Sequence, residues 1–126
     1  MKRFWGAVLL LVFIMAACIF SAVVVDGFAK TTIEHLESAM DRAEEKNYAA
    51  ANVHCTEAAA LWTEKSALLG SLLRHSEADR VETGLAQLVS YSETADHDEF
   101  MALCEEVIHD IRHVRDMELP LLRNIL

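Results

Sequence analysis

The side chains best suited to bind a ligand lie in the second half of the 126-residue chain. His75, Asp79 and Glu82 are spaced at i, i+4 and i+7, so on a helix their side chains share one flank. Imidazole and carboxylate groups are common ligands of metal ions. The spacing makes these three residues candidate metal ligands, and the alternative is a solvated helix face with a few intrahelical pairs.

A second set of side chains, Glu106, His109 and His113, shares one face of a later helical segment. It contains one Glu-x-x-His step of the kind that di-iron bundles use, but those bundles need two such steps from different helices. The face lies opposite the apolar stripe of the same segment, so we expect it to be solvent-exposed. The sequence has no glycine-rich phosphate loop, serine nucleophile elbow or His-Glu-x-x-His motif. It therefore predicts no catalytic residue, no cofactor and no enzymatic activity.

The three cysteines, Cys18, Cys55 and Cys104, show no Cys-x-x-Cys spacing typical of a metal site. Cys55 and Cys104 fall on apolar stripes, where buried thiols act as small hydrophobic side chains. The alternative is a disulfide between them, which an extracytoplasmic location would allow.

Four amphipathic segments must position these side chains, because apolar residues recur along each of them at helical spacings of three and four. The four stripes are Ile33, Leu36, Met40 and Ala43; Tyr48, Ala51, Cys55, Ala58 and Trp62; Ala78, Val81, Leu85 and Leu88; and Phe100, Leu103, Cys104, Val107, Ile108, Ile111 and Val114. Short connectors require neighbouring helices to run antiparallel. The sequence predicts an all-α fold: an N-terminal transmembrane helix followed by an antiparallel four-helix bundle or a pair of helical hairpins, with Trp62 as a core anchor.

Local sequence features predict where these helices begin and end. Thr31-Thr32-Ile33-Glu34 fits a capping box, which predicts a helix start at Thr31. Residues 44–47 form a polar stop, the second helix should end near Gly70, and residues 92–98 form a polar connector. A shift of 52 residues aligns the first and second pairs of stripes, which indicates either related hairpins or a chance match of two helical patterns.

Pro120 is expected to kink or end the fourth helix. The segment beyond it is rich in apolar residues, which must pack back on the bundle, touch lipid or bind a partner. The candidate partner-binding residues are Leu121, Leu122, Ile125 and Leu126.

The stretch from Phe4 to Val25 is uncharged and apolar except for Gly6 and Ser21. Its 22 residues form a helix of about 33 Å, long enough to cross the hydrocarbon core of a bilayer. Lys2 and Arg3 precede it, which predicts a cytoplasmic N terminus and an extracytoplasmic domain in the cell membrane. The alternatives are a lipoprotein, lipidated at Cys18, and a signal peptide cleaved before Lys30.

Charge separates the two parts of the chain. Residues 1–25 hold the cytoplasmic start and the transmembrane anchor, whereas residues 26–126 carry nine Lys and Arg against all 20 Asp and Glu. The resulting net charge of −11 disfavours nucleic acids as partners, because phosphate binding needs a basic surface. We expect one acidic extracytoplasmic helical domain that the stretch from Phe4 to Val25 anchors in the bilayer.

Five short segments resemble the domain-of-unknown-function 4363 family, a group of short single-anchor helical proteins of Gram-positive, Clostridia-like bacteria. The segments are Lys46-Asn47-Tyr48, Trp62, Arg74 to Asp79, Glu99-Phe100 and Leu122 to Leu126. The resemblance spans nearly the whole chain and carries over Trp62, His75, Asp79 and the ending Asn124-Ile125-Leu126, although Tyr48 stands where a Trp is expected. It implies a retained anchor and a helical extracytoplasmic domain, and it implies no known activity.

These features favour a non-enzymatic interaction or scaffold module in the bacterial envelope, with an envelope protein as its partner and a homo-oligomer as a further possibility. The alternative is a sensory or metal-binding helical module that uses His75 and Asp79.

Overall fold

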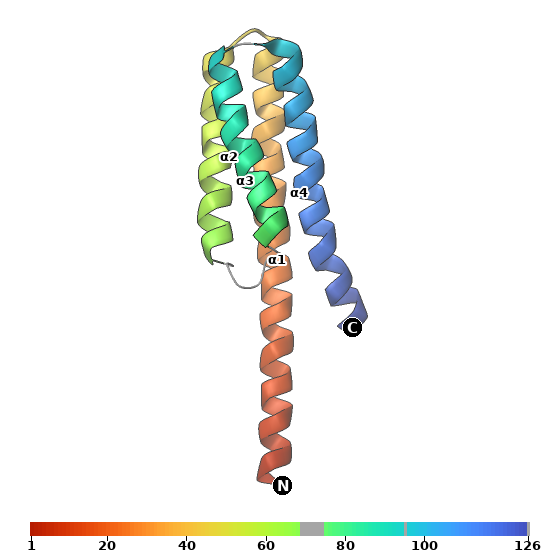
Figure 1. The fold of residues 1–126 in the computed structure, drawn as a ribbon. Helices are drawn as coiled ribbons and strands as arrows, with labels where there is room; N and C mark the ends of the chain where they lie inside the picture. Colours follow the sequence, from red (N-terminus) through yellow and green to blue (C-terminus); the bar gives the residue numbers. More distant parts are fainter. Residues whose placement is uncertain (69–74, 95, 126) are drawn as a thin grey trace.

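The computed structural model describes residues 1–68, 75–94 and 96–125, and the side chains of residues 75 and 118–125 lie outside the described part. Four helices account for nearly all of it: α1 (Lys2–Glu44), α2 (Tyr48–Leu68), α3 (His75–Thr94) and α4 (His97–Ile125) (Figure 1). The described ranges contain no strand. The predicted all-α fold is confirmed.

The helices form a bundle in which each helix contacts the two that flank it. α1 packs against α2 and α4, and α3 packs against the same two helices, so α1 and α3 lie on one diagonal and α2 and α4 on the other. Successive helices run in opposite directions, and α1 extends well beyond the bundle toward the N terminus (Figure 1). This is the predicted antiparallel four-helix bundle.

The first helix begins far earlier than the capping box predicts. α1 is continuous from Lys2 to Glu44, so the prediction of a helix start at Thr31 is wrong. The Thr31 hydroxyl donates to the carbonyl of Gly27 at 3.0 Å, and the buried Thr32 hydroxyl donates to Phe28 at 2.7 Å. Both threonines thus bond one turn back within the helix, because the preceding apolar run is already helical and leaves no free amide to cap.

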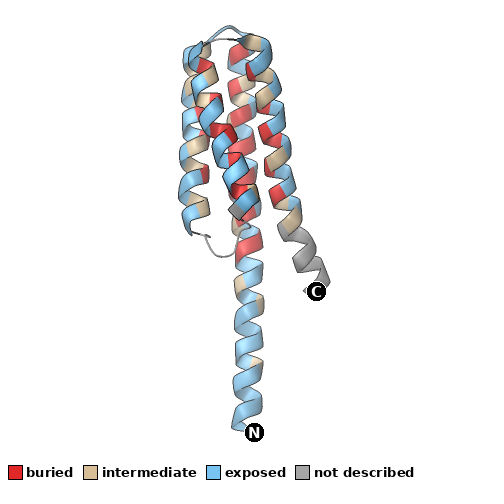
Figure 2. Cartoon of the chain, in the orientation of Figure 1, coloured by how far each residue is buried: buried red, intermediate tan, exposed pale blue. Residues whose placement is uncertain are grey.

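The predicted apolar stripes form the core, which runs the length of the bundle (Figure 2). Within α1 the small Ala39 is fully buried, and Met40 of the predicted stripe is only half-buried. The largest fully buried side chains are Trp62, Phe100, Leu36, Leu85, Leu88 and Ile111. The periodicity therefore identified the buried face of each helix.

Trp62 is the core anchor that the sequence predicts. Its side chain is fully buried, and its ring meets Phe28 edge-on at a centroid distance of 5.1 Å and an interplanar angle of 72°. The indole Nε1–H donates to the carbonyl of Ala78 at 3.2 Å. Trp62 therefore joins α2 to both of its neighbours, α1 and α3.

The turn between α1 and α2 follows the predicted polar stop. Lys46 adopts a left-handed backbone conformation with φ of 63°. Its amide donates to Ala43 at 2.9 Å, and the Asn47 amide donates to Arg42 at 2.8 Å, which is the Schellman arrangement at a helix C terminus. The Asn47 side chain then accepts a hydrogen bond from the Ala50 amide at 3.2 Å and caps α2.

The connector between α3 and α4 is shorter than residues 92–98. α3 continues to Thr94 and α4 begins at His97, so the prediction that Ser92 lies in a polar connector is wrong. Ser92 is buried, donates to the carbonyl of Val89 at 2.6 Å and accepts a hydrogen bond from Asn52 of α2 at 2.8 Å. Because these two bonds satisfy its hydroxyl, a polar residue is tolerated inside the bundle.

α4 does not end at Pro120, as the sequence analysis allowed, but continues to Ile125. A proline lacks an amide donor and its ring crowds the carbonyl four residues earlier, but the residues after it can still bond to carbonyls of the preceding turn. Leu121, Leu122 and Ile125 belong to this last part of α4, and their side chains and the whole of Leu126 lie outside the described residues.

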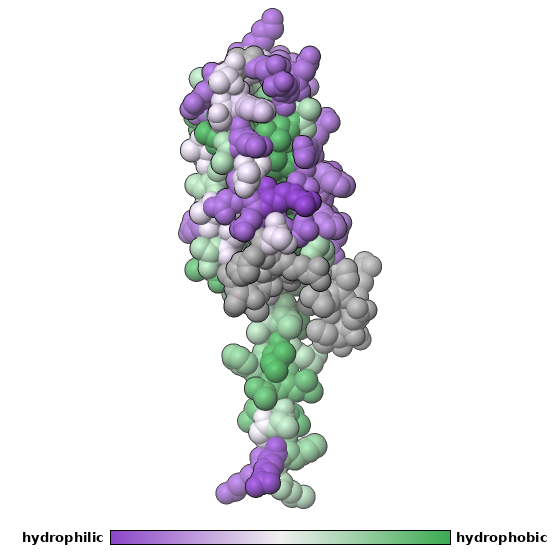
Figure 3. All heavy atoms as spheres, viewed as in Figure 1, coloured by the Kyte–Doolittle hydropathy of each residue, from purple (hydrophilic) through white to green (hydrophobic). Residues whose placement is uncertain are grey.

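Residues 4–20 of α1 form an apolar segment, which we call the apolar rod. It extends from the bundle (Figure 3). The 43 residues of α1 give a length of about 65 Å. Its most apolar 18-residue window has a mean hydropathy of 3.1, so α1 is long and apolar enough to cross a membrane. Most large apolar side chains from Phe4 to Phe20 are exposed, whereas burial in the bundle begins at Ser21, inside the predicted anchor.

Candidate functional site

Three polar side chains that the sequence analysis did not single out meet between α1 and α2. They are His35 of α1 and His54 and Glu57 of α2, and each offers a ligand atom that lies within 4.8 Å of the other two. Both histidines are half-buried, and Glu57 is exposed. We call these residues the His35–His54–Glu57 cluster.

Helix geometry explains why these three residues meet. His35 precedes the fully buried Leu36, and His54 precedes the fully buried Cys55, so both imidazoles sit at the edge of the core. His54 and Glu57 are three residues apart and share a face of α2. The tight turn at Lys46 folds α2 back along α1 and brings that face beside His35.

One buried ring nitrogen of the cluster has no hydrogen-bond partner among the described residues. His35 Nδ1 lies 3.4 Å from Glu57 Oε2, and the rings of His35 and His54 lie 6.0 Å apart, tilted by 41°. The His54 Nδ1 atom is buried and has no hydrogen-bond partner among the described residues. Since buried polar atoms are nearly always paired, this atom points to an interaction that the protein side chains do not supply.

The candidates from the sequence are arranged differently. Asp79 and Glu82 are exposed on α3, and His75 is the first residue of α3, with its side chain outside the described part. Their use as metal ligands stays a prediction. Glu106, His109 and His113 are exposed on α4, which confirms the solvent-facing position expected for that set.

The family described as Domain of unknown function (DUF4363) matches residues 19–125. The chain belongs to this family. Comparison with curated proteins and with solved structures finds no match. The matched range begins next to Ser21, where burial in the bundle starts, and it includes the whole His35–His54–Glu57 cluster. The family region of this chain is therefore the bundle, and most of the exposed apolar rod precedes it.

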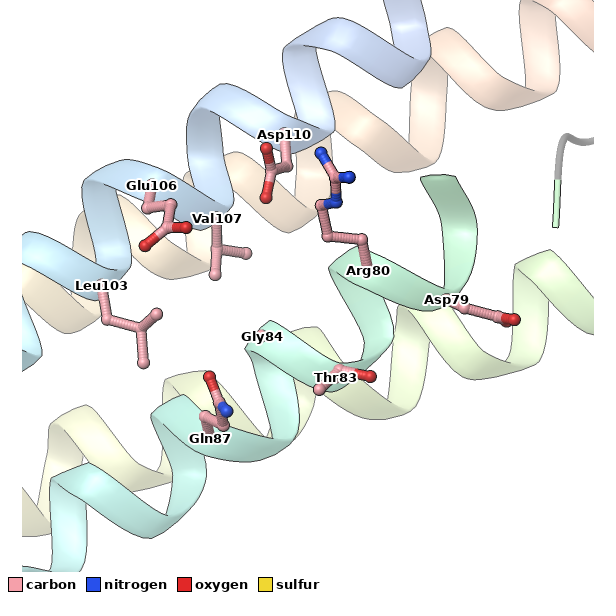
Figure 4. A pocket seen from close by; sticks show the side chains of 9 residues that line it. All are labelled: Asp79, Arg80, Thr83, Gly84, Gln87, Leu103, Glu106, Val107 and Asp110. Carbon is pink, nitrogen blue, oxygen red and sulfur yellow. The ribbon is translucent and has the colours of Figure 1, made fainter. Parts of the chain in front are cut away.

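A groove between α3 and α4, apart from the cluster, is also lined by polar side chains. Its volume is about 320 Å³, and the residues around it are Asp79, Arg80, Thr83, Gly84, Gln87, Leu103, Glu106, Val107 and Asp110. Figure 4 shows Arg80 and Asp110 reaching toward each other across the gap between the helices. Gly84 forms part of the groove because it has no side chain, and a Cβ built there lies 2.7 Å from a Val107 methyl group.

The buried cysteines do not form a reactive pair. Cys55 and Cys104 are free, and since no Cα atom of α2 comes within 8 Å of one in α4, their Cα separation exceeds the reach of a disulfide. Burial raises the pKa of the Cys55 thiol to about 12. Burial also raises the pKa of Cys104, with smaller contributions from Cys55 and Glu105. Both thiols therefore act as small hydrophobic side chains, as the first interpretation predicted.

Another histidine, His97, forms a contact at the end of the bundle opposite the apolar rod. The Tyr48 hydroxyl and His97 Nδ1 lie 2.9 Å apart in a hydrogen bond that joins the start of α2 to the start of α4. This contact positions the ends of α2 and α4. Among the described histidines, the buried ring nitrogen without a partner therefore belongs to the cluster between α1 and α2.

Proposed function

We propose that the protein is a non-enzymatic helical module that α1 tethers to the cell membrane, with its acidic bundle on the extracytoplasmic side. The observation that supports this proposal is the continuity of α1. Its exposed apolar part and its buried part, which contains Leu36 and Ala39, belong to one unbroken helix. A bundle that shares a helix with its anchor is held at the membrane surface without a flexible linker.

Charge supports the proposed orientation and the proposed kind of partner. Lys2 and Arg3 precede the apolar part, as is typical of a cytoplasmic N terminus. The bundle is strongly acidic, so a protein with a basic surface in the cell envelope fits it better than an anionic lipid surface or a nucleic acid. A second copy of the chain is the other protein partner that the proposal admits.

Labelling of single cysteines in intact cells tests the tether and its orientation. In a Cys18→Ser background, Asp41→Cys introduces an exposed thiol at the far end of the bundle, and a cysteine inserted between Met1 and Lys2 introduces one before the apolar part while keeping both basic residues. A membrane-impermeant maleimide should label the Asp41→Cys variant in intact cells and the insertion variant only after permeabilisation. The reverse pattern would contradict the orientation, and recovery of the protein in the soluble fraction would contradict the tether.

Cross-linking tests the interaction role. A photoreactive residue placed at exposed positions of α2 and α3 should give one reproducible product, either a heteromeric complex or a dimer, after extraction in mild detergent. A matched position on the exposed apolar rod should not give that product. If no bundle position gave a cross-linked product and the protein stayed monomeric, the proposed interaction role would be contradicted.

A further inference from the structure

We propose that His35, His54 and Glu57 form a binding site for a single Zn²⁺-class transition-metal ion that links the anchor helix α1 to α2. This inference is independent of the membrane orientation and of any partner. It depends on the side chains that meet between two packed helices.

The donor set selects the class of ion. Two imidazole nitrogens and one carboxylate oxygen are the ligands that Zn²⁺ uses in sites with three protein ligands and one open position. Ca²⁺ and Mg²⁺ prefer oxygen ligands and are a poor match for two imidazoles. The chemistry of the cluster therefore favours Zn²⁺ over the alkaline-earth ions.

The observed distances suit such an ion. Zinc bonds of about 2.1 Å in a tetrahedral arrangement place two ligand atoms about 3.4 Å apart. His35 Nδ1 and Glu57 Oε2 lie 3.4 Å apart. The ligand atom of His54 lies within 4.8 Å of both, a gap that a rotation of its half-buried ring can close.

Burial supplies the second, independent observation. The His54 Nδ1 atom is buried without a hydrogen-bond partner among the described residues, although it lies in a cluster that also holds an imidazole and a carboxylate. A metal ion between the three side chains would bring His54 into a bonded network through one of its ring nitrogens. Glu57 and the half-exposed ring of His35 leave the site open to solvent, so an ion can enter it.

The proposed ion has a structural consequence. His35 lies on the helix that contains the apolar rod, and His54 and Glu57 lie on α2, so the bound ion joins the two helices in the half of the bundle nearer Lys46. Ligands that bind only the folded state raise its stability. The module should therefore become more stable as the free metal concentration rises above Kd.

The test uses the full chain, purified in detergent without a polyhistidine tag and stripped with a chelator. Equilibrium dialysis against ZnCl₂ should give one Zn²⁺ per chain. Circular dichroism should follow the thermal unfolding. At a free Zn²⁺ concentration of about a hundred times Kd, the midpoint of unfolding should rise by roughly 10 °C. MgCl₂ and CaCl₂ should give no comparable rise.

Matched variants locate the site. His35→Gln, His54→Gln and Glu57→Gln should each weaken Zn²⁺ binding at least tenfold. The His109→Gln/His113→Gln variant on the exposed face of α4 and the His75→Gln/Asp79→Asn variant on α3 should bind Zn²⁺ like the parent. If either control lost Zn²⁺ binding and the cluster variants kept it, the proposal would be overturned. The site would then lie on the helix of that control, α4 or α3.

A measurement on the parent protein covers variants that do not fold. Ring ¹⁵N resonances should shift on addition of Zn²⁺ for two of the six histidines and remain in place for the other four. Co²⁺ in place of Zn²⁺ should give the intense visible absorption of a four-coordinate ion. Failure of the parent to bind Zn²⁺, or a shift of histidines other than His35 and His54, would overturn the proposal.

Discussion

Trp62 connects three helices through one buried side chain, so it should dominate the stability of the bundle. Trp62→Ala removes the ring contact with Phe28 and the hydrogen bond to Ala78, and it leaves a large cavity. The free energy of unfolding should fall by roughly 3 to 5 kcal/mol, measured by chemical denaturation in detergent. Trp5→Ala, at a 64% exposed position of the apolar rod, is the control and should leave bundle stability unchanged. Equal stability of both variants would contradict this role for Trp62.

Two glycines within helices make a matched pair with opposite expected effects. A Cβ at Gly84 meets a Val107 methyl group at 2.7 Å, whereas a Cβ at Gly27 meets nothing within 4 Å. Gly27→Ala should raise the free energy of unfolding by about 0.5 to 1 kcal/mol through helix propensity. Gly84→Ala should lower it by about 1 kcal/mol, because overpacking against the buried Val107 outweighs the same gain.

A double variant checks the cause of the Gly84 effect. Val107→Ala removes the methyl group that the new Cβ meets, so the loss in the Gly84→Ala/Val107→Ala variant should be smaller than the sum of the two single losses. Thermal unfolding of the four proteins gives this comparison. Strict additivity would show that α3 and α4 do not approach closely at Gly84.

The buried thiols should make stability depend on alkaline pH. Cys55 keeps its proton in the folded state up to a pKa of about 12, whereas an ordinary thiol loses it near 9.0. The unfolded chain thus binds fewer protons above pH 9, so the free energy of unfolding should fall as the pH rises from 9 toward 12. Cys55→Ala should have a shallower decline, and Cys18→Ala, which keeps both buried thiols, should match the parent. Equal slopes in all three proteins would contradict the assignment.

The His35–His54–Glu57 cluster could not be found from residue spacing along single helices, because its members come from two helices. His75, Asp79 and Glu82 stand out in the sequence because they recur at helical spacing along a single helix. His35 lies on a different helix from its neighbours in the cluster. Folding the chain back at Lys46 would have placed His35 opposite Glu57 and one turn from His54, since Glu57 is as far after Lys46 as His35 is before it. The missing information was the register of two helices.

At the scale of elements, the turn at Lys46 joins the two helices that carry the cluster. Lys46 has φ of 63°, where a Cβ is strained and glycine is not. Lys46→Gly should therefore raise the free energy of unfolding by about 1 kcal/mol. Lys46→Ala removes the same charge but keeps the Cβ, so it should show no such gain. A gain of equal size in both variants would attribute the effect to charge and not to backbone strain.

Helix faces were predictable from the sequence, but helix boundaries were less so. The buried faces follow from the spacing of Ile33, Leu36 and the other stripe residues, because only one side of each helix meets the core. The capping box at Thr31 misled because threonine hydroxyls bond equally well to carbonyls inside a helix. Ser92 was mistaken for a connector residue because its partner, Asn52, lies on another helix. Local polarity does not report such distant partners.

At the scale of the whole molecule, the bundle and the apolar rod overlap within α1. The predicted anchor reaches Val25, yet Ser21, Ala22 and Val25 are already buried in the bundle. Seven further buried positions along α1, from Phe28 to Ala43, continue this contact. The bundle therefore begins before the apolar sequence ends. Cleavage of the N terminus would destabilise the bundle only if it removed residues from Ser21 onward.

The core position of Phe28 argues against one of the three fates of the N-terminal segment, cleavage before Lys30. Cleavage before Lys30 would remove the buried Val25, Phe28 and Ala29, including the ring that packs on Trp62, and would cost several kcal/mol of stability. Cleavage before Cys18 would remove no residue classed as buried, so a lipidated chain would keep the bundle. We predict that the full chain is retained, because the apolar run continues past Cys18 and supplies a complete span.

Intact-mass measurement of the membrane-extracted protein, with Cys18→Ser as its control, separates the three outcomes. The parent should have the mass of the uncleaved chain, and the variant should differ from it only by the substitution. A parent mass that begins at Cys18 with added lipid, together with an unprocessed variant, would replace the transmembrane anchor with a lipid anchor. A mass that begins at Lys30 would contradict both forms of anchoring. It would also require a stable bundle without Phe28, which the Phe28→Ala variant of the full chain tests separately by its thermal midpoint.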